Sequence, residues 1–407
     1  LKVPIHQNQP DPMTKIDRVR CAFEHQQPDR TPIAENLIKS PTFDVLIGRP
    51  SIVSDFRYRM KCLKEWEWEQ LVEQEVKDYM DLYQLLDLDM IAIGKNLPQD
   101  FARPEKIGDA IWRQGNEIVK YHQSSDVIEW ITEDEPPEVE KEKLHLERLS
   151  EPSDAKPVLV KEDELYVLRA LRSHFKKQGD PPALVVPCYS LGVAWLPSYQ
   201  LLWFYTCPDE LHEEYRRITD VTIREMKFWA EQGAIVFGVG GDLASDKGPI
   251  ISPEHYDEFI MPEIKRQAEA VHQLGGYAVN TTDGDLWPIL DSFLLGTGVD
   301  GYAEIDKGAG MEIKQLKERY GEQTCFIGNV DARVTLCSGT TEEVRREVHE
   351  LLDAGAGDGG HILMSSNCIH KDVKPENYIA MVQAYREHFG LPRLDLEGAS
   401  ASSSKGK

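Results

Sequence analysis

Eight short apolar segments recur along the 407-residue chain, and helix-like stretches separate them. Short apolar segments bounded by Gly, Pro or Asp are typical of buried strands. The stretches between them, such as residues 209–232 and 341–354, place apolar residues at the three- and four-residue spacing of an amphipathic helix. The expected strands are Pro32–Glu35, Asp89–Ile93, Ala183–Pro187, Ala234–Val239, Tyr277–Asn280, Asp300–Ala303, Cys325–Ile327 and His361–Met364.

The alternation of strand and helix predicts an α/β fold with a parallel sheet, and eight such units predict a (β/α)8 TIM barrel. We expect this barrel to be a single domain over residues 31–392, after an N-terminal extension and first helix over residues 1–30. Residues 100–160 break the pattern, and we expect an inserted hairpin and a charged linker there. Residues 393–407 are mostly small and polar, which predicts a disordered tail.

The charge of the chain restricts its partners. Lys and Arg number 46 against 70 Asp and Glu, so the formal charge is −24, which disfavours binding to nucleic acid or to an anionic membrane surface. No apolar run approaches the roughly 20 residues of a membrane span, and the N-terminus lacks the apolar core of a signal peptide. The seven cysteines are scattered and form no CxxC pair, as in proteins of a reducing compartment. These features predict a soluble, cytoplasmic protein.

Polar side chains follow several of the expected strands, at the end where an α/β barrel carries its active site. Carboxylates and thiols at such positions indicate acid–base or metal chemistry. Structural readings are also open, because Asp-Gly is a common turn, a Glu caps helices and a lone Cys is often buried as a small apolar residue. The candidates are Asp242, Asp283, Glu304 and Cys368, with His370 as a further one.

A dense group of aromatic residues follows the expected strand at residues 183–187. It could form an apolar wall for an aromatic substrate, although packing between helices explains it equally well. The sequence leaves both interpretations open. The group comprises Trp195, Tyr199, Trp203, Phe204 and Tyr205.

Four blocks of sequence carry a family resemblance: MTKIDRVRCAFEHQQPDRTPI, DLASDKGPIISPEHYDEFIMPEIK, AGMEIKQLKERYG followed by IGNVD, and KPENYIAMVQAYREHFG. Through them the chain resembles the uroporphyrinogen decarboxylase superfamily from Met13 to about Leu391. The resemblance implies a (β/α)8 barrel independently of the strand count. Its two branches are cofactor-free decarboxylases of tetrapyrrole carboxylates and zinc-dependent methyltransferases that exchange methyl groups with a corrinoid protein.

The decarboxylase branch carries paired arginines soon after its Asp-Arg-Thr-Pro element, where they hold substrate carboxylates. The matching segment here, IAENLIKSPTFDVLIGRP, has only Lys39 and Arg49 as basic residues. A substrate with several carboxylates needs fixed cations in an acidic protein. This difference favours the methyltransferase branch.

The methyltransferase branch implies a zinc site built from a His-x-Cys-Gly motif and a later cysteine. Cys368 matches the later cysteine, but Thr281 and Asp283 stand at the His and Cys positions of the motif. Threonine is a poor zinc ligand, whereas aspartate is an ordinary one. We therefore hypothesise that Asp283, Glu304 and Cys368 hold Zn²⁺ with a fourth position open for substrate. Such a site offsets negative charge on oxygen and favours an oxygen-bound methyl group.

The leading hypothesis is a methyltransferase component that demethylates a small methyl ether or methylamine and passes the methyl group to a corrinoid protein, with Asp242 and Asp283 as catalytic groups. The alternative is a metal-free decarboxylase of the uroporphyrinogen type, in which Asp242 or Asp283 protonates a carbanion. A third hypothesis is a non-catalytic protein that binds a corrinoid or a tetrapyrrole. Dimers are usual among similar proteins, so the resemblance also implies a homodimer.

Overall fold

A seven-stranded parallel sheet is the centre of the fold. The computed structural model describes residues 13–132, 135–152, 160–356 and 359–396. The strands follow the order β1-β6-β7-β10-β11-β12-β13, and each begins within two residues of a strand predicted from the sequence. They span Met90–Ala92 (β1), Ala183–Pro187 (β6), Val236–Gly240 (β7), Tyr277–Thr281 (β10), Gly301–Ala303 (β11), Cys325–Ile327 (β12) and His361–Ile362 (β13).

The first predicted strand is present as single-residue bridges. Ile33 pairs in parallel with Leu363, the residue after β13, and Ala34 pairs in parallel with Met90 in β1. The segment at residues 33–34 therefore connects the two edge strands, and the sheet curls round on itself. Because parallel strands in a curled sheet all end on one side, the loops that follow them converge there.

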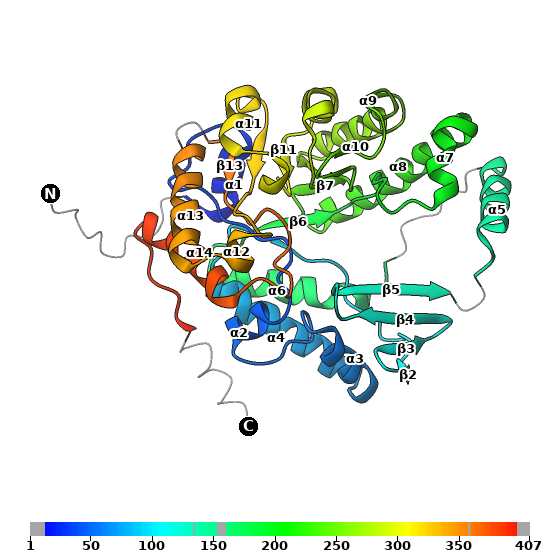
Figure 1. Cartoon of the computed structure of the whole chain (residues 1–407). Helices are drawn as coiled ribbons and strands as arrows, with labels where there is room; N and C mark the ends of the chain where they lie inside the picture. Colours follow the sequence, from blue (N-terminus) through cyan, green and yellow to red (C-terminus); the bar gives the residue numbers. More distant parts are fainter. Residues whose placement is uncertain (1–12, 133–134, 153–159, 357–358, 397–407) are drawn as a thin grey trace.

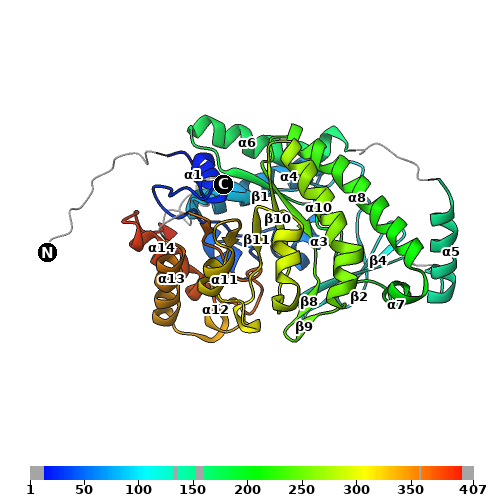
Figure 2. The ribbon, with the colours of Figure 1, turned by 90° about the horizontal axis from the view of Figure 1, so that it is seen from above.

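Helices cover the outside of the sheet (Figures 1 and 2). Helix α13 illustrates why they form: Thr340 and Glu343 build a capping box at its start, and the apolar side chains of Val344, Val348 and Leu352 are buried. The longer helices are α1 (Lys15–Phe23), α2 (Thr42–Ile47), α3 (Phe56–Glu65), α4 (Trp68–Leu86), α6 (Tyr166–Gln178), α7 (Ser198–Thr206), α8 (Pro208–Glu231), α10 (Met261–Gln273), α11 (Ile313–Tyr320), α13 (Thr341–Gly355) and α14 (Pro375–His388).

Short elements complete the loops between strands and helices. They are the pair β8 (Ala244–Ser245) and β9 (Gly248–Pro249), the helices α9 (Pro253–His255) and α12 (Thr335–Ser338), and the single turns η1 (Glu162–Leu165), η2 (Tyr256–Ile260), η3 (Trp287–Ile289), η4 (Ser292–Gly296) and η5 (Lys307–Ala309).

The insertion is more ordered than the sequence predicts. In place of a single hairpin, a four-stranded antiparallel sheet stands beside the barrel (Figure 1). In place of a charged linker, helix α5 (Glu138–Ser150) packs near α7 and α8: Trp203 Nε1 donates to Glu142 at 2.9 Å, and Arg148 pairs with Glu214 at 2.9 Å. The single predicted hairpin is therefore not confirmed, since its strands belong to a larger antiparallel sheet, and the segment predicted as a linker is a helix in which charged side chains find partners of opposite charge. The strands are β2 (Glu105–Gly108), β3 (Ile111–Gln114), β4 (Glu117–His122) and β5 (Val127–Thr132).

A buried ion-pair cluster lies just before β1, at the end of the barrel opposite the convergent loops. Asp89 is fully buried and pairs with Arg18 at 2.6 Å and with Arg30 at 2.8 Å. Its second oxygen also accepts the backbone N–H of Ile33, so the cluster links α1, β1 and the bridging segment. These contacts give Asp89 a structural role at the amino end of the sheet.

Two further expectations from the sequence concern the C-terminal tail and membrane-spanning helices. The tail predicted over residues 393–407 lies outside the described residues from position 397 onward. None of the helices formed by the described residues combines the length and the apolar character that crossing a membrane requires.

Candidate active site

A cavity of about 540 Å³ opens where the loops after the parallel strands converge. All four residues singled out as site residues line it: Asp242, Asp283, Glu304 and Cys368. They come from the loops after β7, β10, β11 and β13, so four strands that are separate in sequence deliver them to one place. The structure thus brings the predicted residues together, while their chemical roles stay predictions.

Glu304 directly follows β11 and has a left-handed backbone, with φ of 61°, which non-glycine residues rarely adopt. The side-chain amide of Asn36 donates a hydrogen bond to its Oε1 at 2.7 Å. Burial raises the pKa of Glu304 to about 7, and the charges of Asp242 and Asp283 add to this rise. A carboxyl group with such a pKa exchanges its proton near neutral pH, as a general acid or base requires.

Asp283 is placed by the tight turn after β10. Gly284 has φ of +87°, and a Cβ atom there would lie 2.8 Å from the carbonyl oxygen of Ser245, so only glycine fits between this turn and the β8–β9 pair. Asn367 donates its side-chain amide to Asp283 Oδ2 at 3.0 Å. Burial, followed by the charge of Asp242, raises the pKa of Asp283.

Asp242 is held at the mouth of the cavity by an aromatic residue. The indole N–H of Trp195 donates to Asp242 Oδ2 at 2.8 Å. The preceding Gly241 has φ of +148°, and a Cβ atom there would lie 2.7 Å from the backbone nitrogen of Gly192. This close approach of two backbones fixes the direction in which Asp242 leaves β7.

Cys368 lines the cavity on the loop after β13, but His370 does not line it. Burial raises the pKa of the Cys368 thiol, and the nearby Lys39 opposes this only in part. The His370 ring instead faces Cys337, with 3.7 Å between Nε2 and Sγ. His370, the further candidate from the sequence, therefore does not join the four predicted residues that line the cavity.

The arrangement does not form a ready metal centre. Within the described ranges, no three His, Cys, Asp or Glu side chains are grouped closely enough to hold a metal ion. Two of the predicted zinc ligands are instead engaged by amides, Glu304 by Asn36 and Asp283 by Asn367. The side chains as placed therefore do not fit the zinc site that the resemblance implied, and zinc stays a prediction.

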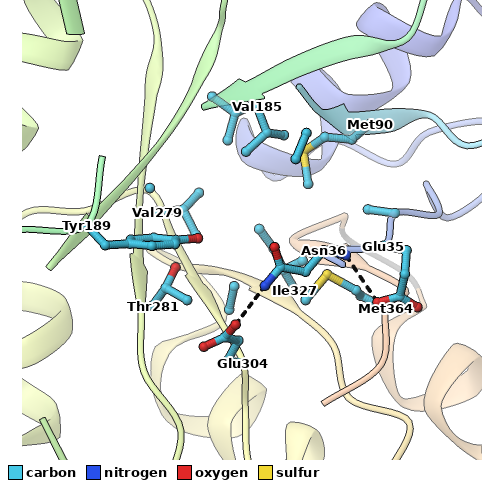
Figure 3. A pocket seen from close by; sticks show the side chains of 15 residues that line it. Glu35, Asn36, Met90, Val185, Tyr189, Val279, Thr281, Glu304, Ile327 and Met364 are labelled. Atoms are coloured by element: carbon cyan, nitrogen blue, oxygen red, sulfur yellow. Dashed lines mark hydrogen bonds between the residues drawn. The ribbon is translucent and has the colours of Figure 1, made fainter. Parts of the chain in front are cut away.

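A smaller, apolar chamber of about 40 Å³ continues the cavity into the barrel (Figure 3). Asn36, Tyr189, Thr281 and Glu304 line both spaces, so the two are contiguous. The inner walls are mainly apolar, with side chains from Met90, Val185, Val236, Val279, Ile327 and Met364. Such a volume is enough for one water molecule or one methyl-sized group.

Glu35 also lines this inner chamber, although nothing in the sequence pattern singles it out. Its Oε1 accepts a hydrogen bond from the Ser365 hydroxyl at 2.6 Å, and the Tyr378 hydroxyl lies beside the same carboxyl group. Complete burial raises the pKa of Glu35 to about 7. A second carboxyl group that can carry a proton at neutral pH thus lies on the other side of Asn36.

Two further residues of the site were not predicted: Asn36 and Tyr189. Each follows a predicted strand by a few residues, which is the only signal that the sequence offers for them. The Tyr189 ring lies across β7, because a Cβ atom on Gly238 would come within 2.3 Å of its Cε1. Burial raises the pKa of Tyr189 to about 12, so its phenol stays neutral.

The aromatic residues after β6 do not all have the same role. Each of the two interpretations that the sequence left open holds for part of the group. Trp195 lines the cavity and is 83% exposed. Trp203 is completely buried in the main core, and Phe204 packs there beside it. Only the first residue of the group therefore belongs to the candidate site.

Comparisons with known proteins agree with the resemblance seen in the sequence. The family model described as uroporphyrinogen decarboxylase matches residues 130–388. The uroporphyrinogen decarboxylase of Syntrophotalea carbinolica is 26% identical over 182 residues, which cover 44% of this chain and 49% of the relative. That of Alkalilimnicola ehrlichii is 29% identical over 204 residues, covering 49% of this chain and 52% of the relative. The chain spans about half the length of these curated relatives.

Among solved structures, a methyltransferase from Methanosarcina mazei has a similar fold. The TM-score is 0.61 at 19% sequence identity, and the likeness covers 93% of this chain and 99% of that chain. It therefore extends over nearly the whole of both proteins.

Proposed function

The chain belongs to the uroporphyrinogen decarboxylase family, and within it we propose that this protein acts as a methyltransferase. It would take a methyl group from a small methyl ether or methylamine and pass it to a corrinoid carried by a partner protein. One observation carries the proposal: the cavity is lined by three carboxylates, and none of its described lining residues is Lys, Arg or His. A tetrapyrrole with several carboxylates needs fixed cations, so this cavity suits a small donor without negative charge.

The cavity also offers the acid–base chemistry that demethylation needs. When the methyl group leaves, the oxygen or nitrogen of the donor keeps the electron pair of the broken bond. An alkoxide leaves poorly unless it receives a proton at the same time. Glu304 carries a proton near neutral pH and lines the same cavity as Asp242 and Asp283, so it can supply that proton. A corrinoid carried by a partner protein would supply the nucleophile that accepts the methyl group.

Zinc remains part of the proposal as a prediction only. No step is assigned to it, because the predicted ligands are engaged by amides rather than grouped around one point. Elemental mass spectrometry of protein purified without chelator tests the prediction. About one zinc per chain, lost in an Asp283→Ala/Cys368→Ala variant, would support it, whereas a metal-free parent that cannot be reconstituted would remove it.

A decarboxylase without metal is the second candidate, and one observation favours it. A carboxylic acid with a pKa of about 7 could also protonate the carbanion that remains after CO₂ leaves, and Glu304 and Glu35 both meet this condition. The absence of lining cations in the described cavity argues against a substrate of the uroporphyrinogen type but leaves a smaller acid open.

An anaerobic assay with cob(I)alamin separates these functions, because methylation of the cobalt changes its visible spectrum. We expect turnover with 2-methoxyethanol, a methoxylated phenol or trimethylamine, and a large loss of rate in Glu304→Gln. Glu231→Gln, an exposed carboxylate on α8, is the matched control and should retain the rate. Decarboxylation of uroporphyrinogen without any methyl transfer would contradict the proposal, and a spectral shift on binding without turnover would favour a non-catalytic binding protein.

A further inference from the structure

The charge of the cavity restricts which methyl donor it can bind. Asp242, Asp283 and Glu304 line one hollow of about 540 Å³, and the mutual repulsion of their charges contributes to the raised pKa of Glu304. A neutral donor would leave this repulsion in place. A cation in the hollow would offset it.

The cations nearest the cavity are already paired with other carboxylates. Lys39 pairs with Asp126 at 3.1 Å. Arg333 pairs with Asp246 at 2.7 Å and with Asp306 at 2.9 Å. Neither basic residue lines the cavity, and Arg333 lowers the pKa of Asp283 by less than burial and the neighbouring carboxylates raise it.

Two aromatic side chains line the same hollow. Trp195 is 83% exposed, so its ring is not packed in the core, and its indole N–H donates a hydrogen bond to Asp242. Tyr189 is neutral at physiological pH because its pKa is raised to about 12. Neutral aromatic rings beside carboxylates are the surroundings in which proteins recognise methylated ammonium groups, by attraction between the cation and the ring faces.

Buried polar atoms on the same walls lack well-aligned hydrogen bonds among the described residues. The Thr281 hydroxyl lines both chambers, is 3% exposed as a residue and makes no well-aligned hydrogen bond among the described residues, with the Tyr189 phenol as a neighbour. Glu35, on the inner chamber, likewise has a carboxyl oxygen, Oε2, without a well-aligned hydrogen bond, and the Tyr378 hydroxyl lies beside this carboxyl group. The Thr281 hydroxyl therefore leaves hydrogen-bonding capacity on the cavity wall for a ligand or ordered water.

We infer that the cavity binds a small methylated ammonium cation, with its charge among Asp242, Asp283 and Glu304 and its methyl groups against Tyr189 and Trp195. The apolar inner chamber has room for one methyl group, which matches the size of an N-methyl substituent. This inference deepens the proposed function, on which it rests for the meaning of the ligand as a methyl donor. It narrows the donor to the nitrogen class.

Choline and its uncharged carbon isostere, 3,3-dimethylbutan-1-ol, test the inference, because the two differ in charge and hardly in shape. Isothermal titration calorimetry on chelator-treated protein excludes a metal ion as the competing cation. We expect choline to bind at least about tenfold more tightly than the isostere. Equal binding of the two, or no binding of choline at millimolar concentration, would overturn the inference.

Two variants locate the binding. Trp195→Leu and Glu304→Gln should each reduce choline affinity about tenfold or more, with little effect on the isostere. Trp130→Ala, which removes an exposed tryptophan from β5 outside the cavity, and Glu231→Gln are the matched controls. Melting temperatures establish that each variant is folded, and unchanged choline affinity in both cavity variants would place the ligand elsewhere and overturn the assignment.

Failure of the inference is distinguishable from failure of the proposed function. Methyl transfer from a neutral ether by a protein that does not prefer choline would remove the inference and retain the function. A clear preference for choline without methyl transfer from any donor would retain the binding site and remove the function.

Discussion

The side-chain amide of Asn36 donates a hydrogen bond of 2.7 Å to Glu304, although 268 residues separate the two along the chain. The backbone N–H of the same asparagine donates to Glu35 Oε1 at 3.1 Å. Asn36 therefore connects the two carboxyl groups whose pKa is raised to about 7. Both carboxyl groups line the inner chamber (Figure 3), and Glu304 lines the open cavity as well.

Removing this connection should destabilise the protein in a way that depends on the charge of Glu304. We expect Asn36→Ala to lower the free energy of unfolding by about 1–3 kcal/mol at pH 8, because a buried carboxylate loses its donor. In a Glu304→Gln background the same substitution should cost less. Urea denaturation of the four proteins in this double-mutant cycle measures the coupling, and equal losses in both backgrounds would mean that the hydrogen bond contributes nothing.

Burial of Glu35 should make stability depend on pH. Its pKa is about 7 in the folded protein against an ordinary 4.5, so between these values the folded state keeps a proton that the unfolded state has lost. Stability contributed by this group therefore falls as pH rises through this window. Glu35→Gln stays neutral, and we expect it to be more stable than the parent by about 3 kcal/mol at pH 8 and little different near pH 5.

Denaturation curves at several pH values check the Glu35 prediction. Glu231→Gln is the control, since an exposed carboxylate should show no such pH dependence. A Glu35→Gln variant whose advantage is the same at pH 5 and pH 8 would show that Glu35 titrates normally.

The ion-pair cluster before β1 should matter for stability and not for binding. Asp89→Asn removes the buried carboxylate that Arg18 and Arg30 share, and although Arg18 retains Asp29 at 2.7 Å, we expect the substitution to cost about 3–5 kcal/mol. Asp87→Asn, in a half-exposed pair with Lys15, should change the free energy of unfolding by less than about 1 kcal/mol. Chemical denaturation compares the two, and similar small effects would contradict the structural role of Asp89.

Gly238 makes room for the ring of Tyr189. A methyl group on Gly238 would clash with that ring, so Gly238→Ala should displace it and weaken choline binding about tenfold. When Tyr189 is first replaced by Ala, the clash disappears, and Gly238→Ala should have no further effect. Calorimetric titration of the two single variants and the double variant tests this dependence; additive losses would mean that the glycine acts through some other contact.

The strands could be predicted from the sequence because each is a short apolar run between helices, and β10 and β12 were located almost to the residue. The segment at residues 33–34 looks no different in sequence, yet it pairs through single bridges. The number of residues over which two strands pair depends on how neighbouring strands are twisted and staggered. An apolar run in the sequence does not reveal this arrangement. The insertion was predicted less completely, since charged residues are compatible with both an exposed linker and a helix such as α5.

The site was predictable where side chains directly follow strands, as Asp283 and Glu304 do. Asn36, Tyr189 and Glu35 were missed because their importance comes from partners that lie far away in the chain. Trp195 and Trp203 show the same limit: eight residues apart in one aromatic run, one lines the cavity and the other is buried in the core.

The bridging segment also determines when the site can first exist. Glu35 and Asn36 leave the ribosome early, but their partners Ser365 and Glu304 are made roughly 330 and 270 residues later, at the separations of 330 and 268 that the hydrogen bonds span. Until the loop after β13 has been synthesised, the cavity lacks a wall, and a ligand has nothing complete to bind. A ligand can therefore stabilise the folded state only after the whole chain has been made. A nascent or truncated chain lacks this stabilisation.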